Sequence, residues 1–467
     1  MNMLSRFLPR IVCIGVIVFT LLTAGLPASL QVEAAASASA VTTGRGPHAV
    51  ASNPITGRVY AANVDSDSVT VMEHTYGGFT VVATVNVGVT PYALAVNPVT
   101  NKIYVANVDS DNVTVIDGAT NNTITVAAGT KPFAVAVNPV TNMIYIANIG
   151  SNNVTVIDGA TNATVTVQTG ESPFAVAVNM ANNKIYVANV DSDNVTMIDG
   201  TSHTAVTIPA GKGPSALAIN PLTGSVYVAN FYSNTVTKID TTGSTSTVPV
   251  GKTPNAVEVN KVTGTIYVAN GSSNEVTVID GYDHSISTVT VGSGPNALAI
   301  NSATNKIYVA NYDSNNVTVI DGAAHTTTTL SVGRNPIALV VNPELNKIYT
   351  ANFNSNEMTF IEEEVRVTNA DLINLEVSEG SLTPTFDKNI YTYAVYVGHE
   401  VEHTTVTAST YNPAASISVT GQVYGSNQAF PIRLQVGANP VQIVTMAEDG
   451  LTSKTYILTI NRAVNAN

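Results

Sequence analysis

The chain has 467 residues, which is enough for two or three domains, and its formal net charge is −13. Hydrophobic residues make up 45% of it and charged residues only 11%, a composition that argues against disorder and favours a well-packed β protein. The negative charge disfavours nucleic acid and anionic membranes as partners, because phosphate binding needs a clustered basic surface.

Residues 1–35 have the order of a secretory signal peptide. Arg6 and Arg10 precede an apolar run, residues 11–26, and small residues follow at 32–36, where we predict cleavage. A secreted or cell-surface location follows, without a membrane span in the mature protein. An uncleaved N-terminal anchor is the alternative, although the run is shorter than the ~20 residues of a usual spanning helix.

The only cysteine, Cys13, lies inside this apolar run. A lipid-modified cysteine is a second alternative, but the preceding Arg10-Ile11-Val12 lacks the small residues that a lipidation motif places there. The mature protein would therefore have no disulfide. Burial of a large apolar core has to stabilise it instead.

One short element recurs eight times after the signal peptide. Its form at residues 103–107 is Ile-Tyr-Val-Ala-Asn, and successive copies lie 40 to 44 residues apart. The tyrosines of the eight copies are Tyr60, Tyr104, Tyr145, Tyr186, Tyr227, Tyr267, Tyr308 and Tyr349. A fixed period of this size is typical of a repeat architecture, in which one unit alone cannot bury its apolar face.

Each copy predicts four antiparallel strands, which we name a, b, c and d. In the third copy, apolar runs at 133–137 and 144–147 are followed by runs at 154–157 and 164–167 that alternate with Thr, and turn residues separate the four. We expect strands a and b to be buried on both faces and strands c and d to be half exposed. Such a sheet, pressed between neighbouring sheets, is the blade of a β-propeller.

The strand count predicts a ring of eight blades. There are eight a–b–c sets, seven d strands between them, and one d-like segment, residues 40–44, in front of the first set. Because the last set ends at Ile361 without a d strand of its own, the N-terminal segment can complete it and leave no open sheet edge. A seven-bladed ring with one stray repeat is the alternative.

The repeat resembles that of the YVTN-repeat β-propellers of bacterial and archaeal surface proteins. The resemblance rests on runs such as residues 97–107, Asn-Pro-Val-Thr-Asn-Lys-Ile-Tyr-Val-Ala-Asn, and it covers about residues 40–362. The third motif position is Ala in all eight copies, where the family has Thr. The resemblance implies an all-β propeller on an exported protein.

The period stops after Glu362-Glu363-Glu364. Residues 366–465 contain about seven short alternating strands with turn signals between them, which predict a small β-sandwich. This segment resembles the cadherin-like β-sandwich modules of bacterial surface proteins. It lacks the acidic interdomain calcium motifs of true cadherins, so the resemblance does not imply calcium-dependent adhesion.

Catalytic candidates are few. Glu258 lies on an a strand where the other copies have Ala or, once, Val340, and neighbouring a strands carry no histidine or second acid. We interpret Glu258 as a solvated group of the axial channel rather than a general base. We expect no cofactor.

Metal sites are also weakly indicated. His203, His284 and His325 each follow a strand-c Asp by four residues, but these equivalent turns of different blades cannot share one ion, so we interpret them as turn residues. The pattern Asp-Ser-Asp in the b–c turns suggests weak calcium binding, although Asx turns explain it as well. The weak metal candidates are Asp109, Asp111, Asp191 and Asp193.

Candidate binding residues gather where the copies differ, on the face that carries the d–a and b–c turns. The basic candidates, which follow the d-strand Gly, are Arg45, Lys131, Lys212, Lys252 and Arg334. The aromatic candidates are Tyr92, Phe133, Phe174, Phe231, Tyr232, Tyr312 and Phe353. A basic inner ring, an acidic collar from the b–c turns and exposed aromatic rings are typical of a recognition face for a glycan or a protein. Loop drift on a solvated surface is the alternative.

We therefore expect a non-catalytic, monomeric binding or adhesion protein whose partner is a cell-wall or surface glycan or protein. The propeller would be the rigid recognition scaffold, and the sandwich a spacer or second interaction module. A propeller enzyme of the lactonase or lyase type and a structural surface-layer component are the alternatives.

Overall fold

The computed structural model describes residues 37–75, 78–343, 345–362, 370–410, 415–447 and 453–465, so the predicted signal peptide lies outside the described residues. The chain divides into two compact units, and the boundary between them in the sequence falls between residues 365 and 366. In the described part of the chain, we find no helix with the length and apolar character needed to cross a membrane.

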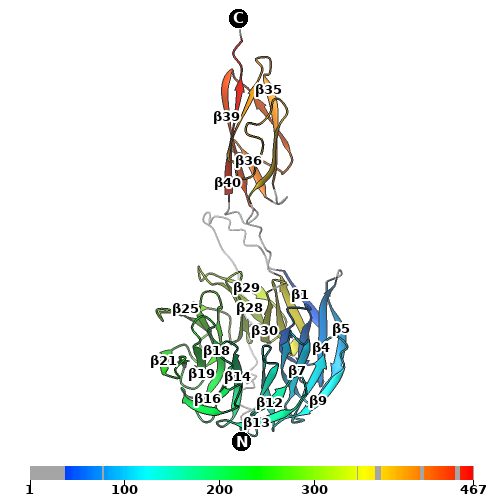
Figure 1. The fold of residues 1–467 in the computed structure, drawn as a ribbon, viewed down its shortest axis with the longest axis vertical. Coiled ribbons are helices and arrows are strands. Elements are labelled where there is room, and N and C mark those ends of the chain that lie inside the picture. The colour runs from blue at the N-terminus through cyan, green and yellow to red at the C-terminus, as the bar shows by residue number, and fades with distance from the viewer. Residues whose placement is uncertain are drawn as a thin grey trace, which may run out of the picture. The chain divides into compact units, whose positions relative to one another are not determined.

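The first unit is a ring of eight four-stranded antiparallel blades (Figure 1). The a strands are β2 (Pro47–Ser52), β6 (Pro91–Asn97), β10 (Pro132–Asn138), β14 (Pro173–Asn179), β18 (Pro214–Ile219), β22 (Pro254–Val259), β26 (Pro295–Asn301) and β30 (Pro336–Asn342). The b strands are β3 (Val59–Asn63), β7 (Lys102–Asn107), β11 (Met143–Asn148), β15 (Lys184–Asn189), β19 (Val226–Asn230), β23 (Ile266–Asn270), β27 (Lys306–Asn311) and β31 (Lys347–Asn352).

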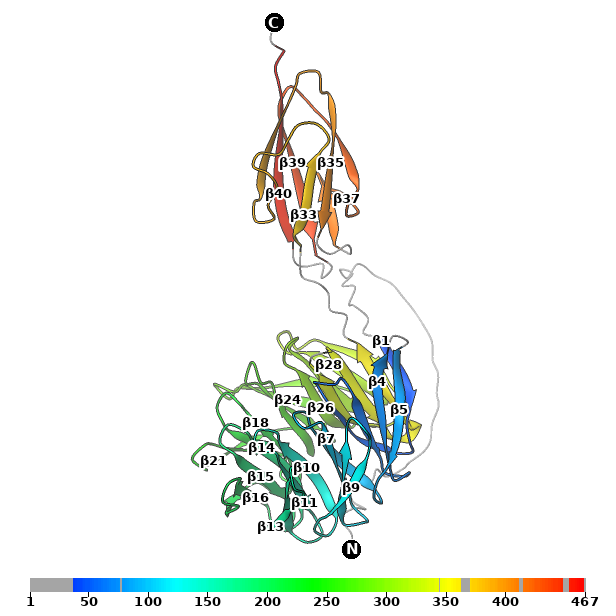
Figure 2. The ribbon, with the colours of Figure 1, turned by 45° about the vertical axis from the view of Figure 1, so that its right-hand side comes forward.

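Strands c and d complete each blade. The c strands are β4 (Ser68–Thr75), β8 (Asn112–Asp117), β12 (Asn153–Asp158), β16 (Asn194–Asp199), β20 (Thr235–Ile239), β24 (Glu275–Ile279), β28 (Asn316–Asp321) and β32 (Glu357–Glu362). The d strands are β5 (Gly78–Asn86), β9 (Thr123–Ala127), β13 (Thr164–Gln168), β17 (Ala205–Pro209), β21 (Thr245–Pro249), β25 (Ile286–Thr290), β29 (Thr327–Ser331) and β1 (Ser37–Thr42). Figure 2 shows d strands such as β21, β13 and β9 at the rim of the ring.

The N-terminal strand closes the ring. β1 pairs antiparallel with β32, with Val41 opposite Met358, and the eighth sheet has the order β1-β32-β31-β30. Each a strand lies against the a strand of the next blade, and β30 lies against β2. The prediction of eight blades with N-terminal closure is therefore confirmed. The strand starts at Ser37, three residues before the predicted segment.

The burial of the strands differs from the expectation. Strand b is buried as expected, but strand c, exemplified by β12, is buried as well, whereas strand a, exemplified by β10, is largely half exposed. The expectation of a half-exposed c and a fully buried a is therefore wrong. Strand a lies at the axis of the ring, where most of its residues stay half exposed. Strand c is covered by side chains of the next blade, as Val154 and Val156 are by Ile185 and Val187.

The apolar core is divided among the interfaces between blades. At one of them, Tyr145, Ala147 and Val154 of the third blade pack against Ile185 and Val187 of the fourth. Burial of one such aliphatic side chain contributes about 1.5–3 kcal/mol. The repeated Tyr-Val-Ala-Asn element is thus the buried seam that joins each blade to the next.

The second unit is a β-sandwich with eight described strands. One sheet has the order β33-β35-β38, and the other has the order β34-β40-β39-β36-β37. The strands are β33 (Leu372–Val377), β34 (Thr392–Val397), β35 (His403–Thr410), β36 (Ser416–Val419), β37 (Gln422–Tyr424), β38 (Ala429–Arg433), β39 (Gly437–Met446) and β40 (Ser453–Arg462). Its core includes Leu375, Val406, Phe430, Ile443 and Tyr456, contributed by both sheets.

Candidate recognition face

The d–a linkers and b–c turns share one face of the propeller, which we call the linker face. Each linker is held between two blades: the side chain of Asp111, in the b–c turn of the second blade, accepts a hydrogen bond from the N–H of Lys131 at 2.8 Å. Ser151, in the b–c turn of the third blade, accepts one from the N–H of Thr130 at 2.9 Å. The linker is thus fixed by side chains from both of the blades that it connects.

The same pair of bonds occurs at all eight linkers. The Asp or Asn acceptors bind at 2.8–3.1 Å and are Asp67, Asp111, Asn152, Asp193, Asn234, Asn274, Asn315 and Asn356. The Ser acceptors bind at 2.9–3.1 Å and are Ser66, Ser110, Ser151, Ser192, Ser233, Ser273, Ser314 and Ser355. The acceptor Asp or Asn has a left-handed backbone in every copy, which these residue types tolerate best.

The Asn of the repeated motif organises the inner side of the linker. Fully buried Asn148 donates to the hydroxyl of Thr155 at 2.9 Å, and that hydroxyl also accepts the N–H of the linker Gly129 at 3.1 Å. Gly129 has to be glycine because an added Cβ would lie 2.5 Å from the Ser151 Oγ. The equivalent Asn–Thr bond is present in all eight copies.

The four weak metal candidates take part in this frame. Asp111 and Asp193 accept linker N–H groups, Asp109 accepts the hydroxyl of Thr90 at 2.7 Å, and Asp191 accepts that of Ser172 at 2.6 Å. Within the described ranges, no three His, Cys, Asp or Glu side chains come together as a metal-binding group. The Asp-Ser-Asp pattern therefore has a structural role, as the Asx-turn interpretation expected, but its carboxylates also bind the linkers, which that interpretation did not include.

The three turn histidines have the role that was expected. His203, His284 and His325 have left-handed backbones, and each N–H donates to the carbonyl of the preceding strand-c Asp, closing the c–d turn. The ring of His284 also contacts Lys238 of the previous blade, 2.6 Å from Nε2 to Nζ.

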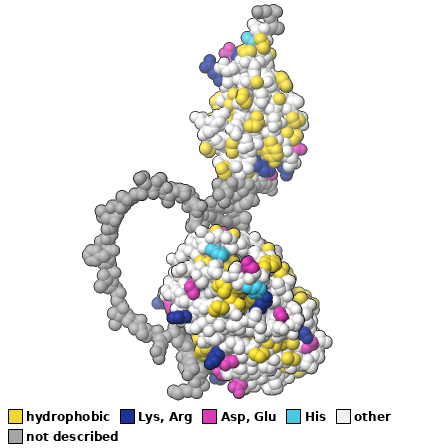
Figure 3. All heavy atoms as spheres, turned by 90° about the vertical axis from the view of Figure 1, so that its left-hand side faces the viewer, with side chains coloured by type: hydrophobic (Ala, Val, Ile, Leu, Met, Phe, Trp, Pro, Cys, Tyr) yellow, Lys and Arg dark blue, Asp and Glu magenta, His cyan; other side chains and the backbone are white. Residues whose placement is uncertain are grey.

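The basic candidates are distributed over separate linkers. Arg45 and Arg334 are exposed, lie on the consecutive linkers that flank the eighth blade, and donate to backbone carbonyls of neighbouring b–c turns at 3.0 and 3.2 Å. Lys212 and Lys252 are exposed on two other consecutive linkers, and Lys131 is half-buried. Figure 3 shows charged side chains of both signs scattered over the side of the propeller that it presents.

Every a strand has a β-bulge directly after its first proline, for example between Pro132 and Ala134. A bulge re-aims one side chain, and bulges are common beside functional sites. The residue at the bulge differs among the blades: it is His48, Tyr92, Phe133, Phe174, Ser215, Asn255, Asn296 or Ile337.

Four consecutive bulge residues form a stack that we call the aromatic arc: His48, Tyr92, Phe133 and Phe174. Their ring centroids are 3.9, 4.2 and 4.6 Å apart in that order. Phe133 is only 7% exposed because its neighbours cover it, so the expectation that this ring is exposed is wrong. Burial also raises the pKa of Tyr92 to about 12.

The other half of the bulge ring is more polar. Asn255 and Asn296 each donate to a carbonyl of the next blade, at 3.2 and 3.1 Å. His48 was missed by the sequence reasoning, although alignment of the copies places it in register with Tyr92. Burial lowers the pKa of His48 to about 4, and its Nδ1 lies 2.9 Å from the carbonyl of Tyr92.

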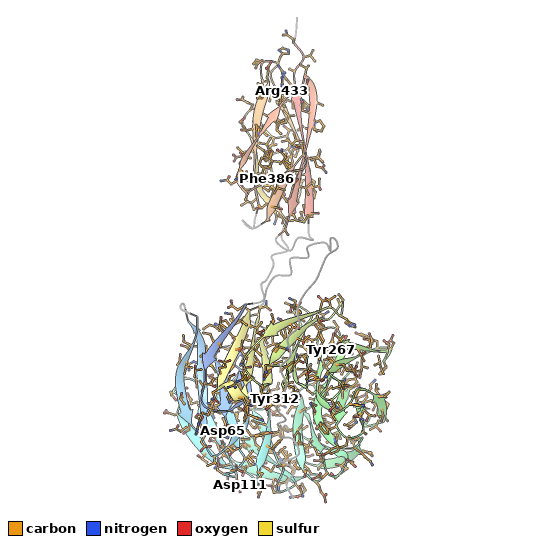
Figure 4. All side chains as sticks on the ribbon, turned by 180° about the vertical axis from the view of Figure 1, so that it is seen from behind. Asp65, Asp111, Tyr267, Tyr312, Phe386 and Arg433 are labelled. Atoms are coloured by element: carbon orange, nitrogen blue, oxygen red, sulfur yellow. The ribbon has the colours of Figure 1, made fainter. Side chains whose placement is uncertain are left out.

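The remaining aromatic candidates lie on the b–c turns. Tyr232 is 46% exposed, and its ring packs over Gly213 and edge-on to Phe231. Tyr312 is half-buried, and Phe353 is edge-on to His48 with centroids 6.3 Å apart. Figure 4 labels Asp65, Asp111 and Tyr312, which all come from b–c turns, and Tyr267, which comes from a b strand.

Glu258 is the only carboxylate on the eight a strands, all of which the structure describes. Part of its side chain is accessible to solvent, although protein atoms crowd around the carboxyl group. This crowding raises its pKa from 4.5 to about 7, against an opposing effect of Lys261. The flanking alanines of the adjacent blades, Ala218 and Ala299, are each 7% exposed.

We expect Glu258→Gln to stabilise the propeller at pH 8 and to leave its stability nearly unchanged at pH 4. The folded protein holds the Glu258 proton up to a higher pH than the unfolded chain does, so stability falls as pH rises from 4.5 to about 7. After allowance for solvent screening in the channel, the gain at pH 8 should be about 1 kcal/mol. Thermal melts of both proteins at the two pH values would measure it, and an equal difference at both would contradict it.

The opposite face, with the a–b and c–d turns, carries a ring of exposed apolar side chains that the sequence reasoning overlooked. They are Ile55 (71% exposed), Val99 (70%), Val140 (77%), Met180 (54%), Leu222 (52%), Val262 (67%) and Leu345 (40%). Five of them occupy the same position, two residues after the buried Asn that ends or follows strand a. In the sequence, these residues are recognisable because an apolar residue recurs within the otherwise polar a–b turn.

The fold defines this protein as an eight-bladed β-propeller joined to a C-terminal β-sandwich. Residues 372–463 match the family described as the cadherin-like beta sandwich domain. The second unit is therefore a cadherin-like β-sandwich. A relative in Evansella cellulosilytica named "Putative membrane protein" is 35% identical over 94 residues. That match spans 20% of this chain and only 14% of the relative.

Solved propeller structures cover 70% of the chain at low sequence identity. Hydrazine synthase of Kuenenia stuttgartiensis is 21% identical, with a TM-score of 0.51 over 98% of its chain. A streptogramin B lyase is 10% identical, with a TM-score of 0.50 over 97% of its chain. A catalytically inactive variant of the virginiamycin B lyase of Staphylococcus aureus, solved with quinupristin, is 9% identical, with a TM-score of 0.51 over its whole chain. At these identities the likeness concerns the fold alone.

Proposed function

We propose that this is an exported, non-catalytic binding or adhesion protein that recognises its partner with the linker face of the propeller. The observation that carries the proposal is the contrast between backbone and side chains on that face. Eight linkers are held by the same bonds, yet the position that donates to the Ser hydroxyl displays a different chemistry from blade to blade. Its occupants are Arg45, Val89, Thr130, Glu171, Lys212, Lys252, Ser293 and Arg334.

A rigid frame with variable side chains suits recognition because little conformational entropy is lost when the partner binds. The aromatic arc and the bulge residues that follow it give the same face an apolar half and a more polar half. Aromatic rings beside amides and cations are the groups that bind a sugar ring or a protein surface. We therefore propose a surface glycan or protein as the partner.

Two further observations support a surface role. The second unit is a cadherin-like β-sandwich, and the repeat of the propeller resembles that of the YVTN propellers of surface proteins. An enzyme of the lyase type would need reactive groups that converge on one point. Glu258 does not lie at the level of the bulge ring that contains His48, because it is three residues beyond the bulge residue of its own strand, Asn255. The lyases among the similar structures share the fold, and their chemistry is not carried over.

Reversal of two linker-face charges tests the proposal. We expect Lys212→Glu/Lys252→Glu to reduce binding to the preferred glycan or surface protein about ten-fold or more. Two exposed cations on consecutive linkers become anions, which repel the partner groups that the lysines attract. Arrays of cell-wall glycans and surface proteins, probed with the full exported chain, would identify the ligand and measure the loss.

The matched control is Lys306→Glu/Lys388→Glu, which changes the net charge equally. Lys306 is the first residue of β27, directly after an a–b turn of the propeller, and Lys388 belongs to the sandwich. The control should bind like the wild type. If both double variants bind equally well, or if the wild type binds nothing on either array, the linker face is not the recognition surface.

A further inference from the structure

The ring closure has a contact that the repeat does not predict. The c and d strands of the first blade, β4 and β5, have 8 and 9 residues, whereas the corresponding strands of the other blades have 5 or 6. The additional residues reach the eighth blade, where Nε2 of His74 lies 2.8 Å from the hydroxyl of Tyr349. In the eighth blade, β32 is thus held by β1, and β31 is held by the first blade.

His74 lies within an aromatic cluster at this closure. Phe79 of β5 is 4.7 Å from its ring and Phe360 of β32 is 5.5 Å from it, measured between centroids. Lys347 of β31 lies 3.2 Å from Nδ1 of His74 and forms an ion pair of 2.6 Å with Glu362. Two blades therefore meet at a single imidazole with one partner on each nitrogen.

These contacts define the protonation state that the closure requires. The ammonium of Lys347 has only hydrogens to offer, so Nδ1 of His74 must accept, and Nε2 carries the hydrogen that is donated to Tyr349. Protonation of Nδ1 would direct a second N–H at the Lys347 ammonium. A neutral imidazole joins the two blades, and an imidazolium repels one of them.

We propose that His74 is an acid-sensitive latch that holds the eighth blade to the first when neutral and releases it when protonated. The charged and titratable groups that face it are Lys347, Glu362 and Tyr349, while Phe79 and Phe360 form the apolar walls. Release weakens the contact between the first blade's long hairpin and β31, while the pairing of β1 with β32 and the packing of β2 against β30 and β31 remain.

The electrostatics agree with this geometry. Burial first, and then Lys347, lower the pKa of His74 below 6.5, while Glu362 opposes them. For a histidine whose folded pKa is lowered, the stabilising contribution is present above pH 6.5 and is lost as pH falls through the folded pKa. The latch is therefore closed at neutral pH and opens in acid.

Hydrogen exchange of the full chain at pH 7 and pH 5, corrected for intrinsic rates, tests the latch. We expect peptides that cover β31 and β32 to exchange about ten-fold or more faster at pH 5, with little change in β11 and β12 of the third blade. In His74→Phe, which has no titrating group, the closure peptides should exchange alike at both pH values.

The control is His203→Asn, because the second and third blades have Asn121 and Asn162 at the same turn position. This variant should keep the wild-type pH response. Equal protection of the closure peptides of the wild type at both pH values would overturn the proposal, and this measurement does not depend on whether His74→Phe folds. A pH response that persists unchanged in a folded His74→Phe protein would overturn it too, and would point to His48 instead.

Discussion

Val41→Asp should lower the free energy of unfolding of the propeller by about 3 kcal/mol, because it places a carboxylate in the strand that closes the ring. Val41 pairs opposite Met358 and packs against the core that the first and eighth blades share. Loss of β1 would expose the edge of β32, a template for pairing with other chains. Thermal and denaturant unfolding would show the loss of stability, and size-exclusion chromatography would show the association.

Thr42→Asp is the matched control for this prediction, because Thr42 is the next residue of β1 and its side chain is exposed. This variant should remain within about 0.5 kcal/mol of the wild type. Equal effects of the two substitutions would mean that the packing of β1 contributes nothing beyond its backbone pairing.

Asn148→Ala should destabilise the propeller by about 2–3 kcal/mol, since it removes a fully buried hydrogen-bonding group and leaves a cavity. Asn148 donates to Thr155 at 2.9 Å and to the side-chain oxygen of Asn153 at 2.8 Å. The loss also frees the Thr155 hydroxyl that binds the linker N–H of Gly129. Denaturant unfolding would measure the destabilisation.

A double-mutant cycle with Thr155→Val separates the bond from the cavity. Thr155→Val removes the acceptor and keeps the shape, so the two effects should be less than additive, with a coupling of about 1 kcal/mol. Strictly additive effects would show that the Asn–Thr bond does not hold the linker, and that the Asn is repeated for another reason.

The period of the sequence was sufficient to predict the blades and their number. A motif that recurs every 40 to 44 residues requires a repeat, and the surplus strand at the N-terminus predicted the closure that β1 and β32 make. The distribution of burial was not predictable in the same way. Apolarity alone cannot distinguish strand a, which stays half exposed at the axis of the ring, from strand c, whose Thr hydroxyls are buried and bound by Asn side chains.

The candidate site could be predicted only in part. Divergence among the copies identified the linker face and most of its side chains, but the linker bonds join residues about 20 positions apart, such as Asp111 and Lys131, and no local pattern reveals them. The aromatic arc depends on a bulge that places Phe133 against Tyr92 and Phe174. His74 escaped notice because it belongs to a hairpin that is longer than the repeat.

The bonds that fix each linker come from residues outside it, and this has a consequence for how the protein diversifies. The N–H of Lys131 is held by Asp111 and that of Thr130 by Ser151, so neither linker side chain is needed for the linker's own shape. Substitutions at the Thr130 position can therefore accumulate with little selection against them on grounds of folding, whereas the left-handed backbone at Lys131 restricts the residue types that fit there. Duplicated blades would inherit a ready display site, and new specificities could arise one linker at a time.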